Sequence, residues 1–474
     1  VTSCSGYPRA KGASSKVPTA WLSLGGQRVY VNVSDSGPGI VRLKRRHIAA
    51  ATVGNALEFY DFLIYALFAI QIGHAFFPTS SAYESLMLSL ATFGAGFATR
   101  PIGAVVLGAY ADRVGRKPAM LLCLMLIGAS ITAMALLPSY ARIGIAAPIL
   151  AVIARLTQGF SLGGEVGSNT AFLAEAAIPE RRGAVVSWQL ASQVTALIIG
   201  SLVGLALTAV MPPALLDVYG WRIALLLGAA VVPFGLWLRT HLPETLHAGE
   251  EGFAPAQAST ALVGIGPVRR HFRVMVLGFV VLAAGTIGQY ISTYIATYAQ
   301  HTLHLSARAG FLAELSGYAA ALPFVLLGGR LSDRYGRWPV NVWSNLAFLI
   351  AIYPTFAWIV AVHSEASLIE GTALLSGLMS LAGGSFLSAL AEALPRSIRS
   401  SGLGTVYALS IALFGGTTQL VVTWLIHVTG SPIAPAWYLV GATAVGQIAY
   451  VLFPETAPVR LRGRKLRAVG GLLP

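Results

Sequence analysis

A few ionisable residues stand inside long apolar stretches of this chain, where an uncompensated charge is costly. Glu58 and Asp61 are three residues apart in one stretch, so on a helix they share a face, and Arg155 stands in another stretch. A carboxylate binds and releases a proton, and a guanidinium beside it keeps it ionised until a competing anion arrives. We therefore expect an Asp61–Arg155 pair near mid-membrane, with reversible proton binding as its chemistry.

A second group of polar residues could receive a small anion. Arg100 is followed by Pro101 and Gly103, which could open a helix locally, and a guanidinium binds a carboxylate through two hydrogen bonds. Two other interpretations of Arg100 stay open, since it could also reach the lipid headgroups or pair with Asp112. Further polar residues crowd three apolar stretches, and we expect them to line a wet cavity, although such residues also join helices: Gln158, Gln189, Gln193, Gln289, Tyr290 and Tyr294.

A short cationic segment occurs twice in the chain. Residues 108–117 read GAYADRVGRK, and 221 positions later residues 329–338 read GRLSDRYGRW. A repeat at this distance indicates two related halves. The glycine favours a tight turn, and the aspartate can offer its charge to a helix N-terminus or to a cation. We predict that these hairpins gate the cytoplasmic side through Asp112, Arg113, Gly115, Arg116, Asp333 and Arg334.

The composition requires a membrane protein. The chain has 474 residues, of which 55% are hydrophobic and 11% charged, with a mean hydropathy of +0.70. Soluble domains carry about 25% charged residues. A membrane-spanning helix needs about 20 mostly apolar residues. By that rule the sequence predicts an all-α protein with twelve spans, at 48–74, 84–108, 118–138, 145–174, 184–211, 221–240, 272–299, 308–329, 339–362, 367–392, 401–427 and 434–453.

The distribution of cations predicts the orientation of these spans. With both termini in the cytoplasm, the cytoplasmic segments hold 23 of the 32 Lys and Arg, and the opposite side holds only three. This is the asymmetry of the positive-inside rule. The net charge of +14 then faces an anionic lipid leaflet, so it gives no reason to expect a nucleic-acid partner.

The same map predicts five parts. We expect a disordered N-terminal tail at 1–44, a six-helix bundle at 45–240, a cytoplasmic linker at 241–271, a second six-helix bundle at 272–455 and a basic cytoplasmic tail at 456–474.

The repeated G-x-x-x-D-R-x-G-R pattern and the 6+6 layout resemble the major facilitator superfamily over about residues 45–455. Residues 54–69 and 155–183 resemble its metabolite:H⁺ symporter branch. Within that branch, residues 86–117 and 293–307 look most similar to the citrate and tricarballylate carriers. The resemblance implies a monomeric symporter in the bacterial inner membrane that moves a small organic anion together with protons by alternating access. The second hairpin departs from the pattern, because it ends in Trp338 instead of a cation.

The resemblance also implies roles for single residues. In proton symporters of this superfamily, an acid on the first span and the Arg of an R-x-x-Q-G motif, here Arg155, often form the coupling pair. Asp61 is then the proton carrier and Glu58 its substitute, while a fixed structural ion pair is the alternative. Glu165 is either a second proton site or a gate partner of Arg113.

Other functions find less support in the sequence. Within transport, the alternatives are uptake of osmolytes such as proline or betaine, and export by antiport; outside transport, the alternative is a membrane sensor that kept the fold. There is no P-loop, no Ser-His-Asp arrangement and no metal-ligand pattern, since Cys4 and Cys123 stand apart and His301 and His304 alone are weak evidence. We expect no enzyme activity, no cofactor and no metal.

Overall fold

A computed structural model of the chain divides into two units, residues 1–43 and 44–474, which are treated separately below. The structure describes residues 20–24, 27–31, 56, 59–60, 64–114, 116–163, 170, 173–174, 177–240, 265–395 and 399–461.

The first unit contains a β-hairpin. Strands β1 (Ala20–Leu24) and β2 (Gln27–Val31) pair antiparallel, with Leu24 opposite Gln27. Only two residues separate the strands, and both are glycine in the sequence, which is a strong signal for a two-residue hairpin turn. The sequence predicts a disordered tail here, so these ten residues differ from that prediction.

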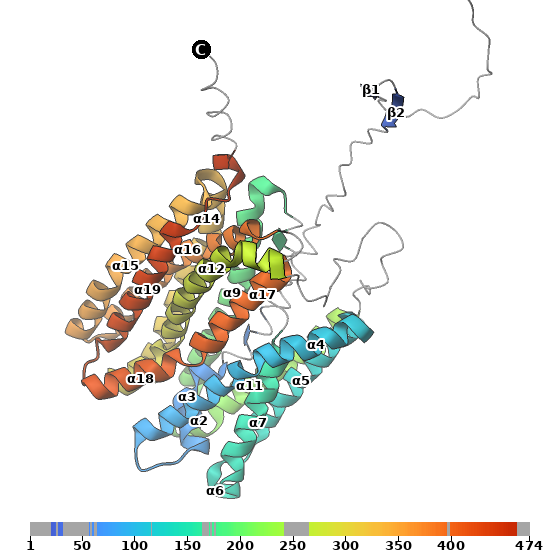
Figure 1. Ribbon diagram of the computed structural model, residues 1–474. Helices are drawn as coiled ribbons and strands as arrows, with labels where there is room; N and C mark the ends of the chain where they lie inside the picture. Colours follow the sequence, from blue (N-terminus) through green and yellow to red (C-terminus); the bar gives the residue numbers. More distant parts are fainter. Residues whose placement is uncertain are drawn as a thin grey trace, which may run out of the picture. The chain divides into compact units, whose positions relative to one another are not determined.

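The first half of the second unit is helical, because its apolar runs are long and rich in Ala and Leu. Its elements, blue to green in Figure 1, are α2 (Ala69–Phe76), α3 (Ala82–Ala98), α4 (Arg100–Val114), α5 (Arg116–Leu136), α6 (Tyr140–Ile143), α7 (Ala146–Ser161), the 3₁₀ turn η1 (Pro179–Arg181), α9 (Arg182–Val210), α10 (Pro213–Leu215), the π-turn η2 (Leu216–Gly220) and α11 (Trp221–Thr240).

The second half repeats this pattern, with two breaks. Its elements, yellow to red in Figure 1, are α12 (Ile265–Thr293), α13 (Ile295–Thr297), the π-turn η4 (Tyr298–Thr302), α14 (Ala307–Tyr335), α15 (Arg337–Val362), α16 (Glu365–Ala393), α17 (Arg399–Ser410), the π-turn η6 (Ile411–Gly415), α18 (Thr418–Thr429) and α19 (Ala434–Leu452).

The described residues include nine helical segments long and apolar enough to cross a membrane, and two shorter apolar helices, Leu121–Leu136 and Ala146–Ser161. These eleven fall at eleven of the twelve predicted spans. The remaining one, 48–74, is described only in part, with α2 in its second portion. The prediction of an all-α membrane-spanning part is confirmed.

Glycines bring α3 and α4 into contact with α7. A Cβ on Gly159 would stand 1.6 Å from the Gly96 carbonyl oxygen, and one on Gly163 would stand 2.1 Å from the Arg100 carbonyl oxygen. Only glycine fits at such distances, so Gly159 and Gly163 serve close helix packing. This packing sets Arg100 and Arg155 on adjacent helices.

Helix α9 belongs to the first half by sequence but packs against α14 and α16 of the second half (Figure 1). Gly204 of α9 makes room for the Phe311 ring of α14, which a Cβ would approach to 2.6 Å. The two halves therefore meet along α9 and α14, and the polar residues described next lie on both sides of this contact.

Candidate functional site

Arg155 lies in a buried aromatic setting on α7. Its side chain is 2% exposed, and its guanidinium carbon stands 4.5 Å from the centre of the Tyr65 ring and 5.2 Å from that of Phe93. The guanidinium also donates to the side-chain oxygen of Gln158, one turn along the helix. The two rings and the amide hold the guanidinium in place.

Arg100 is the second buried cation. It is 6% exposed at the start of α4, and its guanidinium carbon stands 4.7 Å from the centre of the Phe97 ring. It lies close enough to Arg155 for the two charges to repel. A side chain that reached for lipid headgroups would be exposed, so the inward position disagrees with that alternative.

Tyr290 of α12 closes this site from the second half. Its ring centre lies 6.0 Å from that of Phe93 and 5.4 Å from that of Phe97, and its carbonyl oxygen accepts from Gln419 at 3.4 Å. Tyr290 also lies near both Arg100 and Arg155. The two cations therefore face the boundary between the halves.

A second polar contact crosses the same boundary. The Gln193 amide of α9 lies 3.5 Å from the Tyr407 hydroxyl of α17, and Tyr407 interacts electrostatically with Arg100. Gln189, one turn earlier, is fully buried. The sequence predicts that Gln189 and Gln193 line the site, but it does not predict this for Tyr407, because a single Tyr in the 401–427 span forms no pattern with other polar residues.

Two predicted residues lie apart from this cluster. Tyr294 occupies the break between α12 and α13, where its hydroxyl accepts from Thr423 at 2.9 Å. Gln289 is partly exposed, and its side-chain nitrogen has no hydrogen-bond partner among the described residues. The sequence places Tyr290 and Tyr294 on one face, but the helix break sends them to different surroundings.

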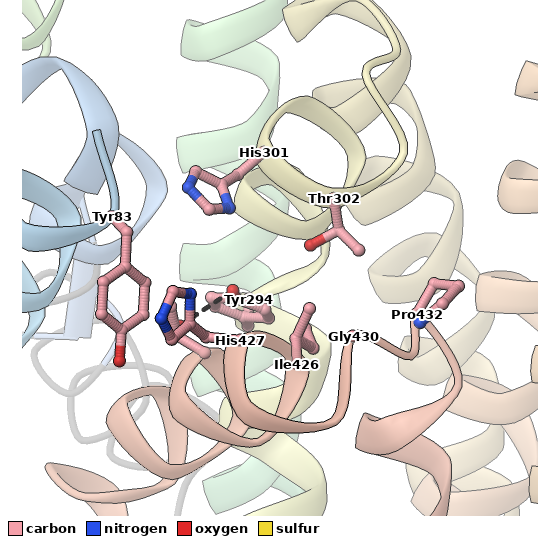
Figure 2. A pocket seen from close by; sticks show the side chains of 9 residues that line it. Tyr83, Tyr294, His301, Thr302, Ile426, His427, Gly430 and Pro432 are labelled. Atoms are coloured by element: carbon pink, nitrogen blue, oxygen red, sulfur yellow. Dashed lines mark hydrogen bonds between the residues drawn. The ribbon is translucent and has the colours of Figure 1, made fainter. Parts of the chain in front are cut away.

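A cavity of about 270 Å³ lies beyond Tyr294, at the end predicted to face outward (Figure 2). Figure 2 shows the Tyr83 and His427 rings side by side, with centres 3.9 Å apart and planes at 14°. His301 of η4 also lines the cavity. The described residues contain no group of three or more His, Cys, Asp or Glu that could hold a metal ion.

Charges join the halves at the opposite end of α9. The Asp333 carboxylate of α14 accepts from the backbone N–H groups of Gly183 and Ala184, both at 2.8 Å. Arg337 contacts Asp333 at 2.7 Å and Glu392 at 3.1 Å, and Glu392 also pairs with Arg182 at 3.4 Å. An aspartate thus caps a helix of the other half, as the hairpin predicts for its Asp residues.

The cation of this network differs from the predicted one. Arg334 is exposed and stacks over Tyr335 at 5.4 Å, whereas Arg337 is 1% exposed and contacts both carboxylates. Arg337 lies one turn after Asp333, across Gly336, whose φ of +106° ends α14 in a conformation that favours glycine. Glu392 pairs both with Arg337 of its own half and with Arg182 of the other half.

The departure from the pattern at Trp338 has a local explanation. Its indole nitrogen donates to the Val451 carbonyl oxygen at 3.1 Å, and the backbone N–H groups of Arg337 and Trp338 donate to the Glu455 carboxylate. Glu455 therefore caps α15 in the second half.

Comparison with known proteins decides the family. The family model described as Major Facilitator Superfamily matches residues 52–416. The chain belongs to the major facilitator superfamily. It is 36% identical over 418 residues to the "Citrate-proton symporter" of Klebsiella pneumoniae, a match that covers 88% of this chain and 93% of the relative. It is 30% identical over 429 residues to the "Glycine betaine/proline/ectoine/pipecolic acid transporter OusA" of Dickeya dadantii, covering 88% and 85%.

Solved structures of major facilitators share the fold. The crystal structure of a D-xylose-proton symporter superposes with a TM-score of 0.69 at 18% identity, covering 86% of this chain and 98% of that one. The predicted fold class and the resemblance to citrate carriers are confirmed. As a member of this superfamily the chain is a multi-pass membrane transporter and not an enzyme.

Several predicted residues of this transporter remain predictions. Glu58, Asp61, Gly115 and Glu165 lie outside the described residues, and the side chains of Asp112, Arg113 and Arg116 are also outside the described part. Of the gate residues, the structure therefore describes the second hairpin only.

Proposed function

We propose that this transporter is a proton-coupled symporter of small organic acids of the citrate type. The observation that carries the proposal is the pair of buried cations, Arg100 and Arg155, in one aromatic-lined site between the halves. Two like charges at close range repel each other, and an anion with two or more carboxylates relieves that repulsion.

The surrounding side chains suit such a substrate. Each guanidinium can bind a carboxylate through two parallel hydrogen bonds. Gln193 and Tyr407 supply neutral hydrogen-bonding groups for a hydroxyl or a third carboxylate, and Phe93, Phe97 and Tyr290 exclude water. Water exclusion strengthens the electrostatic attraction in the site.

Proton coupling is assigned to the first-span acids. With Arg155 beside it, Asp61 stays ionised; when a substrate carboxylate competes for Arg155, Asp61 takes up a proton, so anion and proton travel together. Glu58 is the substitute carrier. Glu165 is the alternative site if Asp61 and Arg155 form only a structural pair.

Alternating access uses the two ends of the α9–α14 contact. The Asp333–Arg337–Glu392–Arg182 network closes the end that we assign to the cytoplasm, and the cavity beside Tyr83 and His427 gives access from the outside. This assignment places both termini in the cytoplasm and the protein in a bacterial inner membrane, as the cation count favours. We expect a monomer to be sufficient.

The second candidate is uptake of a zwitterionic osmolyte, because relatives named as proline or betaine transporters are 30–31% identical to this chain. An aromatic site also attracts quaternary ammonium groups. Here, however, guanidinium groups already lie over the Tyr65, Phe93 and Phe97 rings, so an ammonium would meet like charge. The citrate type is therefore preferred.

Uptake by purified protein in lipid vesicles tests the substrate. With an imposed pH gradient, labelled citrate should accumulate, and tricarballylate should compete while betaine and proline should not. Arg100→Lys and Arg155→Lys should each weaken citrate binding at least about tenfold, because lysine keeps the charge but loses the bidentate geometry. Arg308→Lys, an exposed position, is the matched control. Accumulation of betaine without competition by citrate would overturn the proposal.

Counterflow separates coupling from binding. Asp61→Asn should keep citrate exchange between preloaded vesicles but lose accumulation driven by the pH gradient. Full gradient-driven accumulation in the Asp61→Asn, Glu58→Gln double variant would move the coupling to Glu165 or elsewhere.

A further inference from the structure

Glu314 is a buried acid that the transport mechanism above does not use. It lies on α14, two turns from the predicted outer end of that helix, and its exposed fraction is 0%. In the sequence, Glu314 lies near the end of a predicted span, a position that gives no reason to expect a functional acid. The structure instead seals it at the contact between α9, α13 and α14.

The contacts of Glu314 are few and neutral. The backbone N–H of Ala296 donates to one carboxyl oxygen at 3.2 Å. Ser201 of α9 lies near the same carboxyl, and its buried hydroxyl has no hydrogen-bond partner among the described residues. The other oxygen, Oε2, is buried and has no hydrogen-bond partner among the described residues. No Lys, Arg or His among the described residues forms an ion pair with Glu314.

Among the residues that the structure describes, the groups around the carboxyl offer no compensating charge. Tyr318, one turn further along α14, is the titratable side chain that interacts with it, and the Tyr318 hydroxyl lies 3.1 Å from Thr293 Oγ1. From α9 and α13 come the Ser201 hydroxyl and the Ala296 N–H, neither of which titrates. Arg308, nearly two turns earlier on α14, is exposed.

An ionised carboxylate sealed at this depth without a cation would cost several kcal/mol, so the acid carries a proton in this conformation. We propose that Glu314 is a second proton-binding site, which holds its proton while α9, α13 and α14 are closed around it and exchanges that proton with external water when they separate.

The packing at this point explains how proton occupancy is linked to separation. Gly310, one turn before Glu314, lets α13 lie on α14, since a Cβ there would stand 2.9 Å from Ala296 Cα. Helix α13 follows the break at Tyr294 and ends in the π-turn η4, so it is attached to α12 by an interrupted segment. Movement of α13 away from α14 removes the Ala296 hydrogen bond and opens the carboxyl to water.

The direction in which external pH shifts the equilibrium between the closed and open forms follows from their different proton binding. The closed form keeps the proton, whereas the open form loses it once the solution is more alkaline than the ionisation range of an exposed glutamate. Raising external pH should therefore favour opening, by up to about tenfold per pH unit for one proton. This inference does not require proton-coupled citrate transport, because it concerns the conformational equilibrium of the protein alone.

Infrared difference spectroscopy tests the proton directly. Purified protein in lipid membranes should show the C=O stretch of a protonated carboxylic acid that persists at neutral pH and is absent in Glu314→Gln. Ser201→Ala should keep the band but shift its frequency, because the hydroxyl lies near the carboxyl. Glu370→Gln, at an exposed position on α16, is the matched control and should leave the band unchanged. A neutral-pH spectrum in which Glu314→Gln removes no such band would overturn the proposal.

Cysteine labelling tests the link to opening. Ala299→Cys, on a background with Cys4 and Cys123 replaced by Ala, puts a thiol at a fully buried position of η4. The rate of its reaction with a membrane-impermeant maleimide, corrected for the reactivity of a free thiol, should increase as external pH rises. Glu314→Gln should lower the slope of the logarithm of this rate against pH by up to about one, the value for one proton. An unchanged slope would overturn the link. Since the assay uses neither substrate nor gradient, failure of citrate transport would not affect it.

Discussion

Helices α9 and α14 meet at two ends through different chemistry. At the predicted cytoplasmic end, Asp333, Arg337, Glu392 and Arg182 join the halves through ion pairs and backbone N–H groups. Towards the outer end, the same helices meet through Gly204, Phe311 and the neutral surroundings of Glu314. One contact depends on buried charges that compensate each other, and the other on packing around an acid that must stay protonated.

This difference indicates how the two ends can open in turn. A buried network of opposite charges is stable only when complete, so the loss of one member is costly. The outer contact contains no such network among the described residues, and a change of one proton is enough to alter its stability.

Arg337→Ala should have the largest effect. It removes the cation that contacts both Asp333 and Glu392, at a cost of about 3–5 kcal/mol, because the two carboxylates stay buried with less compensation. The thermal unfolding midpoint of the purified protein should therefore fall, and cysteine probes at the cytoplasmic end should be labelled faster. The control is Arg334→Ala, which is exposed and should change stability by at most about 0.5 kcal/mol. Equal effects of the two variants would contradict the assignment of Arg337 to the network.

Asp333→Asn should have the next largest effect. The neutral amide cannot replace charge-assisted bonds to the Gly183 and Ala184 N–H groups, and hydrogen bonds to charged groups contribute about 1.5–3 kcal/mol. Citrate binding, measured by calorimetry, should stay within about twofold, since the network is remote from Arg155. If binding disappeared while the protein stayed folded, Asp333 would belong to the substrate site and not to the gate.

Gly183→Ala should weaken the same end by crowding. A Cβ there would stand 2.4 Å from Arg337 Nη1 and 2.5 Å from the Gly329 carbonyl oxygen, which predicts a loss of about 1–3 kcal/mol. Gly285→Ala is the matched control, because a Cβ at that position on α12 meets no atom within 4 Å. The thermal unfolding midpoint of Gly183→Ala should therefore be lower than that of Gly285→Ala. A destabilised Gly285→Ala would show that helical glycines matter here for reasons other than space.

Tyr83→Leu should have the smallest effect, at the outer cavity. It removes the ring stacked on His427, and such pairs contribute about 0.5–1.5 kcal/mol. Outer labelling at Ala299→Cys should rise modestly while the cytoplasmic probes stay unchanged. Tyr140→Leu, an exposed position on α6, is the control. A large rise in cytoplasmic labelling would mean that the two ends are not separate.

Part of the candidate site could be predicted from residue type and position in the apolar runs. Arg100 and Arg155 were recognisable because they interrupt predicted spans, and both are buried in the structure. The hairpin pattern correctly predicted an aspartate at a helix N-terminus, as Asp333 shows. Arg334 was named among the gate residues and Arg337 was not, although the pattern contains both, because a motif records residue types and not which face of a helix meets the partner.

Properties that depend on residues close together in the chain could be predicted from the sequence alone. Run lengths of apolar residues predicted the positions of the spans, the repeated hairpin predicted two related halves, and the paucity of charge required a membrane. The tertiary structure decided what depends on contacts between distant residues. Glu392 meets Arg182 210 positions away, Gln193 meets Tyr407, and Glu314 is sealed by α9 and α13. Such pairings follow from how whole helices rotate and pack, which no local pattern contains.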